Sequence, residues 1–330
     1  MPDRRILVIL CLAVAGAIFG SAQIPALAAA PPAFSGRQQI AASARNDVNA
    51  STARARGRRR RAHRRAKPTK HTRKASKVHS VLATTKYNTL IWSDEFSGPA
   101  GTPPSSSKWI HDVGDYGAGA GEEETYTDST ANAALDGQGH LAIVALPQTP
   151  TGPPGQVRSY SSARLETQGL FSVKYGLIEA RMKIPAGAGL WPAFWMLGDD
   201  ITTVGWPACG EIDVMETIGE NPFTVYGTIH GPSGSTAYQI PNTTISATAL
   251  ASGFHTYGVS WSPNTITWLL DGTPYATVTS GDLAPGETWV FNEPFHLVLD
   301  LAVGGSWAGA PNASTQFPAT LLVDWVRVYQ

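Results

Sequence analysis

Three acidic side chains lie close together in the run Gly210 to Glu216, which reads Gly-Glu-Ile-Asp-Val-Met-Glu. The apolar residues between the acids predict a β-strand, in which successive side chains point to opposite faces. Carboxyl groups at Glu211, Asp213 and Glu216 are costly to bury without partners. Their clustering in an apolar strand therefore indicates a chemical use, and this strand is the first candidate for a functional site.

Strict alternation along this strand would place Glu211, Asp213 and Met215 on one face and Glu216 on the other. One extra residue between Asp213 and Glu216, a β-bulge, returns Glu216 to the face of the other two acids. Bulges often redirect side chains beside active sites. We therefore predict a bulge here, with three carboxyl groups on one face of a sheet.

Paired carboxyl groups in this arrangement can hydrolyse a glycosidic bond. A retaining glycosidase uses one carboxylate as nucleophile and one protonated acid, about 5–5.5 Å apart, which two glutamates on one strand can reach. Asp213 between them raises the cost of ionising all three groups and is placed to hydrogen-bond the nucleophile. A calcium site and an exposed acidic strand are the alternatives that this run leaves open.

Tryptophan residues surround the acidic strand in the sequence. Trp191, Trp195 and Trp206 shortly precede Glu211, and Trp307 follows a Gly-Gly pair. Aromatic faces stack on the apolar faces of sugar rings, so these four residues are candidates for a carbohydrate-binding surface. A single Trp is more often part of a core, but four near one acidic strand favour a sugar-binding cleft.

The run from Trp206 to Glu216 resembles the signature of glycoside hydrolase family 16. It is most similar to the bacterial laminarinase (endo-1,3-β-glucanase) branch, which carries the extra residue before the last Glu. Other stretches agree in order: WSDEF (92–96), YT (126–127), SARL (162–165), GLWPAFWML (189–197), LAVGG (301–305) and VDWVRVY (323–329). The similarity covers about residues 87–330.

This resemblance implies a β-jelly-roll sandwich with an open substrate cleft and a retaining mechanism. By position, it implies that Glu211 is the nucleophile, Glu216 the acid/base and Asp213 an assisting carboxylate. Together with the aromatic pattern above, it predicts a set of substrate-binding residues: Trp191, Trp195, Trp206, Asn132, Arg164, His230 and Trp307. His230 on its own would otherwise be interpreted as a core histidine.

The resemblance also implies no cofactor for catalysis and one structural calcium ion on the convex face. Its ligands would be Glu95, a backbone carbonyl around Gly137, and Asp324. Two stretches depart from the family pattern. Glu-Glu-Glu-Thr-Tyr (122–126) replaces an Asn-rich stretch that ends in paired tyrosines, and Ala163 stands where Gly is frequent. Both departures bear on outer subsites, so the reaction type is better defined than the substrate.

The elements that must position these residues are predicted to be strands. From Leu90 onward, short β-rich runs alternate with Gly, Pro, Asn and Asp, and residues 177–184 show period-two alternation. No amphipathic helix of three turns and no fixed-period repeat is evident. The sequence therefore predicts an all-β domain over 86–330, built as a sandwich of two antiparallel sheets.

The chain before this domain has a different composition. Residues 1–80 carry 17 Lys and Arg against two Asp, whereas all ten Trp fall between Trp92 and Trp325. Residues 1–30 have a basic start, an apolar run and an Ala-Leu-Ala cleavage pattern, which predict a signal peptide and a secreted protein. An uncleaved membrane anchor is the alternative.

Residues 31–85 are predicted to be a basic, disordered linker or tail, because they combine like charge with little apolar surface. Such a segment can hold an anionic cell-wall polymer. Nucleic acid is not an expected partner, since no aromatic residue follows Phe34 there for base stacking. Cys209 would be the lone cysteine of a mature chain, which predicts no internal disulfide and a small buried thiol. We expect a monomer.

The leading hypothesis is a secreted enzyme that hydrolyses internal β-1,3 bonds of laminarin-like glucans. A second hypothesis is a hydrolase or transglycosylase that acts on another β-glucan or a β-galactan. A third, from a different class, is a sugar-binding sandwich without turnover. The intact pair Glu211 and Glu216 argues against the third, because a lectin has no need of an acid and a nucleophile.

Overall fold

The computed structural model describes residues 87–115, 120–152 and 157–330. The predicted signal peptide (1–30) and basic segment (31–85) lie outside the described residues, so both assignments stay predictions. Within the described ranges, no helix has the length and apolar character needed to cross a membrane.

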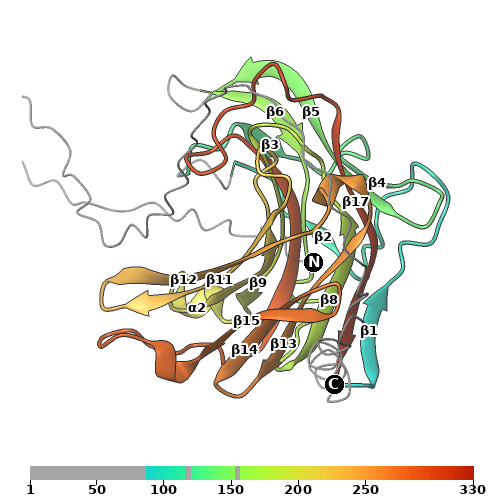
Figure 1. Ribbon diagram of the computed structural model, residues 1–330. Coiled ribbons are helices and arrows are strands. Elements are labelled where there is room, and N and C mark those ends of the chain that lie inside the picture. Colours follow the sequence, from blue (N-terminus) through green and yellow to red (C-terminus); the bar gives the residue numbers. More distant parts are fainter. Residues whose placement is uncertain (1–86, 116–119, 153–156) are drawn as a thin grey trace, which may run out of the picture. The chain divides into compact units, whose positions relative to one another are not determined.

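The described residues fold into two β-sheets, which confirms the predicted all-β sandwich (Figure 1). The larger sheet contains β1 (Leu90–Asp94), β3 (Glu124–Tyr126), β4 (Ala133–Leu135), β5 (Leu141–Thr151), β6 (Arg158–Ser162), β8 (Gly176–Lys183), β13 (His255–Ser262), β14 (Thr265–Leu270), β15 (Thr273–Thr279) and β17 (Ala319–Tyr329). Its strand order is β15-β14-β13-β8-β17-β5-β6-β3, with β1 beside β17 and β4 beside β5. Its pairs are antiparallel except β3 with β6.

The smaller sheet is antiparallel and has the order β12-β11-β10-β9-β16-β7-β2. Its strands are β2 (Ile110–His111), β7 (Arg164–Glu166), β9 (Leu190–Gly198), β10 (Glu211–Glu216), β11 (Thr224–Ser233), β12 (Thr236–Ile245) and β16 (Phe295–Val303). The helices among the described residues are single turns: α2 (Ile201–Val204), η2 (Leu250–Ser252) and η3 (Ser280–Asp282).

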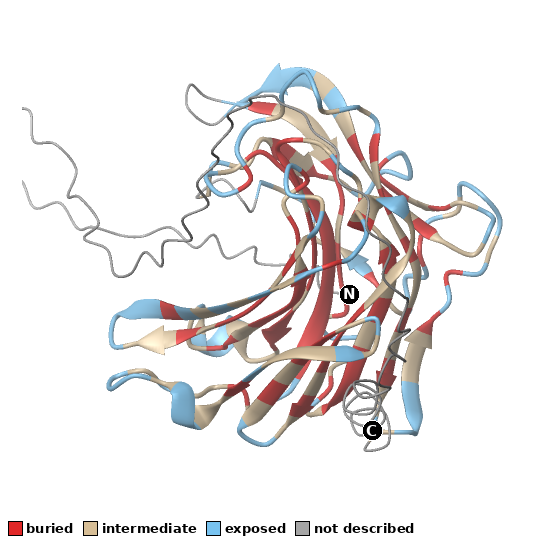
Figure 2. Ribbon diagram, viewed as in Figure 1, coloured by how far each residue is buried: buried red, intermediate tan, exposed pale blue. Residues whose placement is uncertain are grey.

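The core lies between the two sheets, where Figure 2 shows the buried residues gathered on the facing sides. In β8, the predicted alternation holds, because Ile178, Ala180 and Met182 are fully buried while the residues between them are partly exposed. Trp261 of the larger sheet meets Phe295 of the smaller sheet edge-on at 5.3 Å between ring centroids. Such aromatic pairs bury large apolar areas and dominate the energy of a core.

The predicted bulge in β10 is confirmed. Asp213 pairs with Thr228 of β11 and Glu216 pairs with Tyr226, so three steps along β10 match two steps along β11. The pairing of β10 with β9 shifts at the same place, between Asp213 and Met215. The extra residue lies where the sequence places it, between the second and the third acid.

A tryptophan from the larger sheet holds the backbone at this bulge. Trp268 of β14 is fully buried, and its indole Nε1 donates a hydrogen bond to the backbone carbonyl of Asp213 at 2.8 Å. Gly227 of β11 leaves the space for the ring, because a Cβ at this position would overlap Trp268. The opposite sheet therefore fixes the strand that carries the acids.

We expect Trp268→Phe to lower the free energy of unfolding by about 1–3 kcal/mol, because it removes the donor from a buried carbonyl. Denaturant unfolding followed by circular dichroism measures this change. Trp289→Phe is the matched control, since the Trp289 indole donates to Asn292 Oδ1 at a longer 3.3 Å in a partly buried place. An equal loss in both variants would show that the bond to Asp213 has no special part in stability.

Candidate active site

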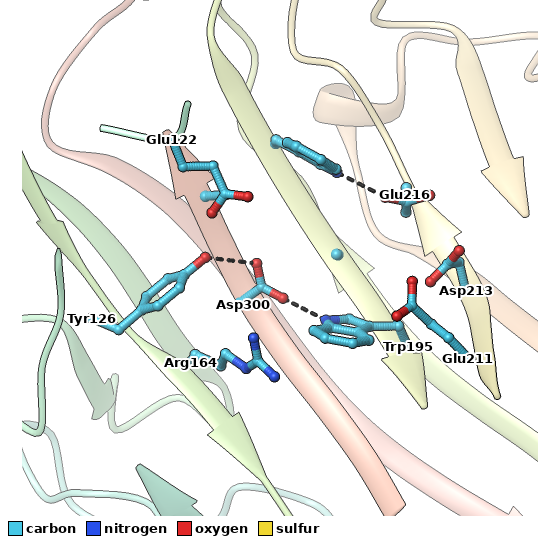
Figure 3. Close-up of a pocket in the computed structure, with 11 residues that line it drawn as sticks. Glu122, Tyr126, Arg164, Trp195, Glu211, Asp213, Glu216 and Asp300 are labelled. Carbon is cyan, nitrogen blue, oxygen red and sulfur yellow. Dashed lines mark hydrogen bonds between the residues drawn. The ribbon is translucent and has the colours of Figure 1, made fainter. Parts of the chain in front are cut away.

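The three acids of β10 line one open pocket on the face of the smaller sheet that points away from the core. The pocket has a volume of about 600 Å³, counted to its open mouth. Figure 3 shows Glu211, Asp213 and Glu216 side by side along one edge of it. Met215, which strict alternation would have put on this face, is fully buried in the core instead. The bulge explains both placements.

Each of the two glutamates accepts a hydrogen bond from an indole. Trp206 Nε1 donates to Glu211 Oε2 at 3.0 Å, and Trp191 Nε1 donates to Glu216 Oε1 at 2.9 Å. These donors orient the carboxyl groups without adding a positive charge. The predicted aromatic residues are thus in direct contact with the predicted catalytic pair.

His230 of β11 lies beside the first two acids. It is the cross-strand partner of Glu211, and its Nε2 lies 3.0 Å from Asp213 Oδ2 and 3.6 Å from Glu211 Oε1. One side-chain atom from each of these three residues falls within 4.8 Å of the others, a spacing that a metal ion can use. The imidazole hydrogen-bonds Asp213 and lies close to Glu211, so it links the surroundings of the two acids.

Burial raises the pKa of all three acids. Desolvation, and then the neighbouring Asp213, raise the pKa of Glu211 to about 8. Desolvation is also the main cause for Asp213, whose pKa rises to about 8, and for Glu216, whose pKa rises well above its ordinary range. Neighbouring carboxyl groups add to the effect, since like charges in one pocket resist a second ionisation. At neutral pH the cluster therefore holds protons.

The surroundings favour different charge states for the two glutamates. Nearby His230, the Trp206 N–H and Arg164 all stabilise the anion of Glu211. The negative charges of Asp213 and Glu211 disfavour the anion of Glu216. The Trp191 N–H and the charge of His230 stabilise that anion. The arrangement can thus supply a carboxylate at Glu211 and a protonated acid at Glu216, the two forms that a glycosidase needs.

The floor of the pocket contains an acid that the sequence analysis did not single out. Asp300 of β16 is buried and accepts hydrogen bonds from Trp195 Nε1 at 2.6 Å and from the Tyr126 hydroxyl at 3.1 Å. Burial raises the pKa of Asp300 to about 6, against the lowering effect of Arg164. A signal was present, because Asp300 is the one acidic residue in the strand Phe295–Val303, where His296 is the other polar residue.

Two further predicted residues, Arg164 and Trp195, line the pocket, whereas Trp206 and Trp307 do not line it but contact residues that do. Arg164 stacks over the Trp195 ring at 4.6 Å and pairs with Asp112 at 3.1 Å. Trp307 is 39% exposed and meets the Trp191 ring edge-on at 5.0 Å. Trp206 is 51% exposed, so its face is open to a ligand. These aromatic surfaces lie near both glutamates.

Asn132 is not among the pocket residues. Its side chain is buried, accepts from the Thr127 hydroxyl at 2.7 Å and donates to the Val144 carbonyl at 2.8 Å and to the Ser161 hydroxyl at 3.1 Å. The amide is therefore used internally to join three segments. This placement gives the predicted sugar contact of Asn132 no support.

The predicted calcium ligands are engaged in other contacts. Glu95 forms two hydrogen bonds with Arg327, at 3.0 and 2.8 Å, and Asp324 pairs with Arg181. Gly137 adopts a left-handed backbone packed against Ala100. Each of the two carboxylates that would bind the ion is thus paired with an arginine, and this arrangement gives the predicted calcium site no support.

The raised pKa values predict a stability cost at high pH. In an unfolded chain these groups ionise near pH 4 to 4.5. In the folded protein burial raises the pKa of Glu211 and of Asp213 to about 8, so the cluster as a whole retains protons that the unfolded chain has lost. Between these limits the folded state binds more protons, so the free energy of unfolding falls as pH rises. We expect Glu216→Gln, which removes one buried ionisable group, to melt a few degrees (~2–6 °C) above the wild type at pH 8. The difference should shrink toward pH 4.5.

Glu220→Gln is the control for this comparison, because Glu220 is exposed and close in sequence. The melting temperatures of the wild type, Glu216→Gln and Glu220→Gln are measured from pH 4.5 to 8. A gain for Glu216→Gln that is the same at every pH would mean that side-chain packing, and not ionisation, causes it.

Comparison with known proteins gives this geometry a family. The model of glycosyl hydrolases family 16 matches residues 122–327. The chain is 39% identical over 256 residues to a β-glucanase of Rhodothermus marinus, which covers 73% of this chain and 85% of that protein. It is 39% identical to the glucan endo-1,3-β-glucosidase A1 of Niallia circulans, of which it spans only 38%.

A solved structure agrees with these sequence relatives. The endo-β-1,3-glucanase of Pyrococcus furiosus superposes with a TM-score of 0.65 at 43% identity, over 73% of this chain and 94% of that one. The resemblance found in the acidic strand thus extends over the whole described domain. The chain belongs to glycosyl hydrolases family 16.

Proposed function

We propose that this chain is a retaining endo-β-1,3-glucanase, with Glu211 as nucleophile and Glu216 as acid/base. The observation that carries the proposal is the placement of both glutamates on one face of a bulged strand, each held by an indole N–H and each in a different electrostatic setting. The names of the related glucanases from Rhodothermus marinus and Niallia circulans support the substrate class.

The reaction follows from these two settings. The Glu211 carboxylate attacks the anomeric carbon, while the proton of Glu216 passes to the glycosidic oxygen and the sugar leaving group departs. A covalent glycosyl-enzyme remains on Glu211. Glu216, now a carboxylate, takes a proton from water, and the resulting attack on the anomeric carbon frees Glu211. Asp213 and His230 hold the Glu211 side of the site in position.

The aromatic side chains suit a polymer that runs past both glutamates. Trp206 presents an open face beside Glu211, and Trp307 with Trp191 presents a second surface beside Glu216. Apolar sugar faces stack on such rings on either side of the bond that is cut. Binding on both sides supports cleavage inside a chain.

We expect Glu216→Ala to lose most activity on natural glucan, whose poor leaving group needs protonation. The variant should still form the glycosyl-enzyme from an aryl β-glucoside, and added azide should then accelerate turnover and give a β-glycosyl azide. Azide attacks without a general base, so its product reports both the role of Glu216 and the retained configuration. Product analysis by NMR is the measurement.

Glu211→Ala is the matched variant, because it removes the nucleophile and leaves Glu216 in place. It should show no azide product of β configuration while still binding the polymer. If both variants respond alike, or if an α-azide forms from Glu216→Ala, the assignment of roles or the retaining mechanism is wrong.

We expect Trp206→Ala to lower kcat/KM on laminarin, with a loss of about 1–3 kcal/mol in transition-state stabilisation. The variant loses both a stacking face and the donor to Glu211. Trp206→Phe keeps most of the ring but removes the N–H, so it separates the two effects. Because Trp206 is 51% exposed, the melting temperature should change little in either variant. A large drop in melting temperature with unchanged kinetics per folded molecule would show that Trp206 is a structural residue.

The linkage preference follows from product analysis on a panel of polymers. Relatives at lower identity are named as a keratan-sulfate endo-1,4-β-galactosidase of Sphingobacterium multivorum and as an endo-1,3-1,4-β-glycanase of Rhizobium meliloti. We expect laminarin to be cut in preference to lichenan, agarose and galactan. Binding without new reducing ends on any of these polymers would leave a sugar-binding module as the better interpretation.

A further inference from the structure

A fifth carboxyl group faces the pocket from the wall opposite β10. Figure 3 shows Glu122 and Tyr126 across the pocket from Glu211, Asp213 and Glu216. Glu122 comes from the segment just before β3 and begins a run of three glutamates, 122–124. The reaction described above gives this carboxyl group no part.

The backbone of Glu122 is held from two sides. Glu122 forms a β-bridge with Gly304, and its carbonyl accepts a hydrogen bond from Arg158 Nη1 at 2.7 Å. Arg158 is buried, with 4% of its surface exposed. The side-chain stem lies beside Gly305, where an added Cβ would come within 3.5 Å of Glu122 Cγ and 3.4 Å of Trp191. The carboxyl group is therefore positioned near the indole that holds Glu216.

The next carboxyl group of the same face does not add to the charge of this wall. Glu124 is buried, and its Oε2 accepts a hydrogen bond from the backbone N–H of Val303 at 2.7 Å. Burial, and then the neighbouring Glu122, raise the pKa of Glu124 well above its ordinary range. The raised pKa favours the protonated form of Glu124, which shares a side-chain hydrogen bond with Glu122 and lies behind the carboxyl group that faces the pocket.

The arginines near this wall already have partners, since Arg158 donates to the Glu122 carbonyl and lies 3.6 Å from Asp115. Of the described residues that line the pocket, Arg164 alone is cationic, and Asp112 already pairs with it at 3.1 Å. The other charged side chains of the pocket are Glu122, Glu211, Asp213, Glu216 and Asp300. A ligand that carried a carboxylate or a sulfate would meet like charge on both sides and no free cation among these residues.

We propose that Glu122 determines specificity by accepting a hydrogen bond from a sugar hydroxyl and by excluding sugar units that carry negative charge. This inference rests on the proposed glucanase function and narrows its substrate class to uncharged β-glucans. Charge-assisted hydrogen bonds to hydroxyl groups reward a neutral sugar, and unpaired like charges penalise an anionic one. Selection against a competitor by repulsion needs no extra contact to the true substrate.

The test compares two polymers with the same backbone. One is laminarin, and the other is a β-1,3-glucan with carboxymethyl groups of known density. We expect the wild type to prefer laminarin, and the ratio of the two kcat/KM values to fall about tenfold or more in Glu122→Gln, which keeps the shape and removes the charge. Glu123→Gln is the matched control, since it removes the same charge from the next residue, which does not line the pocket. It should leave the ratio within about twofold.

A fall of the ratio in Glu122→Gln but not in Glu123→Gln supports the proposal, and an unchanged ratio in both overturns it. If Glu122→Gln is unfolded or inactive, the salt dependence of the ratio in the wild type tests the proposal. The wild-type ratio should fall between 20 mM and 500 mM NaCl, because salt screens repulsion in an open pocket, and a ratio that does not change with salt overturns the proposal.

Failure of the proposed function gives a different result. A wild type that cuts neither polymer contradicts the glucanase proposal, while the same ratio measured from affinity electrophoresis still tests Glu122. A wild type that cuts laminarin with no discrimination against the carboxymethyl polymer leaves the glucanase proposal in place and contradicts the role of Glu122.

Discussion

Three carboxyl groups crowd one face of β10, Asp213 buried and the two glutamates partly buried, and this constraint explains most of what surrounds them. Ionising all three in so small a space would cost many kcal/mol, because each charge is desolvated and repels the others. The structure meets the constraint by retaining protons, as the raised pKa values of Glu211, Asp213 and Glu216 indicate. A cation in direct contact would stabilise the charges, but it would also remove the proton that the leaving group needs. Arg164, the cation of the pocket, pairs instead with Asp112.

Tryptophan solves the same problem in a way that also suits a sugar. Three indole N–H groups each donate to a different carboxyl group of the site: Trp206 to Glu211, Trp191 to Glu216 and Trp195 to Asp300. A neutral donor orients a carboxyl group and lowers the cost of its charge without fixing its protonation state. The ring that carries the donor remains available for stacking on a sugar. Three tryptophans of the domain thus serve the charge of the site and the binding of a sugar at the same time.

The parts of the site that lie within one strand could be predicted from the sequence. Alternation and the cost of burying Glu216 indicated the bulge, and the structure has it at that place. Contacts between distant strands could not be predicted in this way. Neither the bond from Trp268 to Asp213 nor the pairing of Arg327 with Glu95 leaves a local pattern, because each depends on how remote strands meet. Asn132 shows that a family resemblance does not fix the role of a residue, since its amide forms hydrogen bonds inside the fold.

The two sheets divide the work of the domain. The smaller sheet displays the reacting groups on its outer face, while the larger sheet reaches the same strand only through the core, by way of Trp268 and the Asp213 carbonyl. The electrostatic cost of the acids therefore falls on the outer face of β10. On the inner face of the same strand, Ile212, Val214 and Met215 are packed in the core. A strand anchored through its backbone can carry costly side chains without losing its register. This separation allows the charge in the pocket to vary while the core that positions the catalytic pair stays the same.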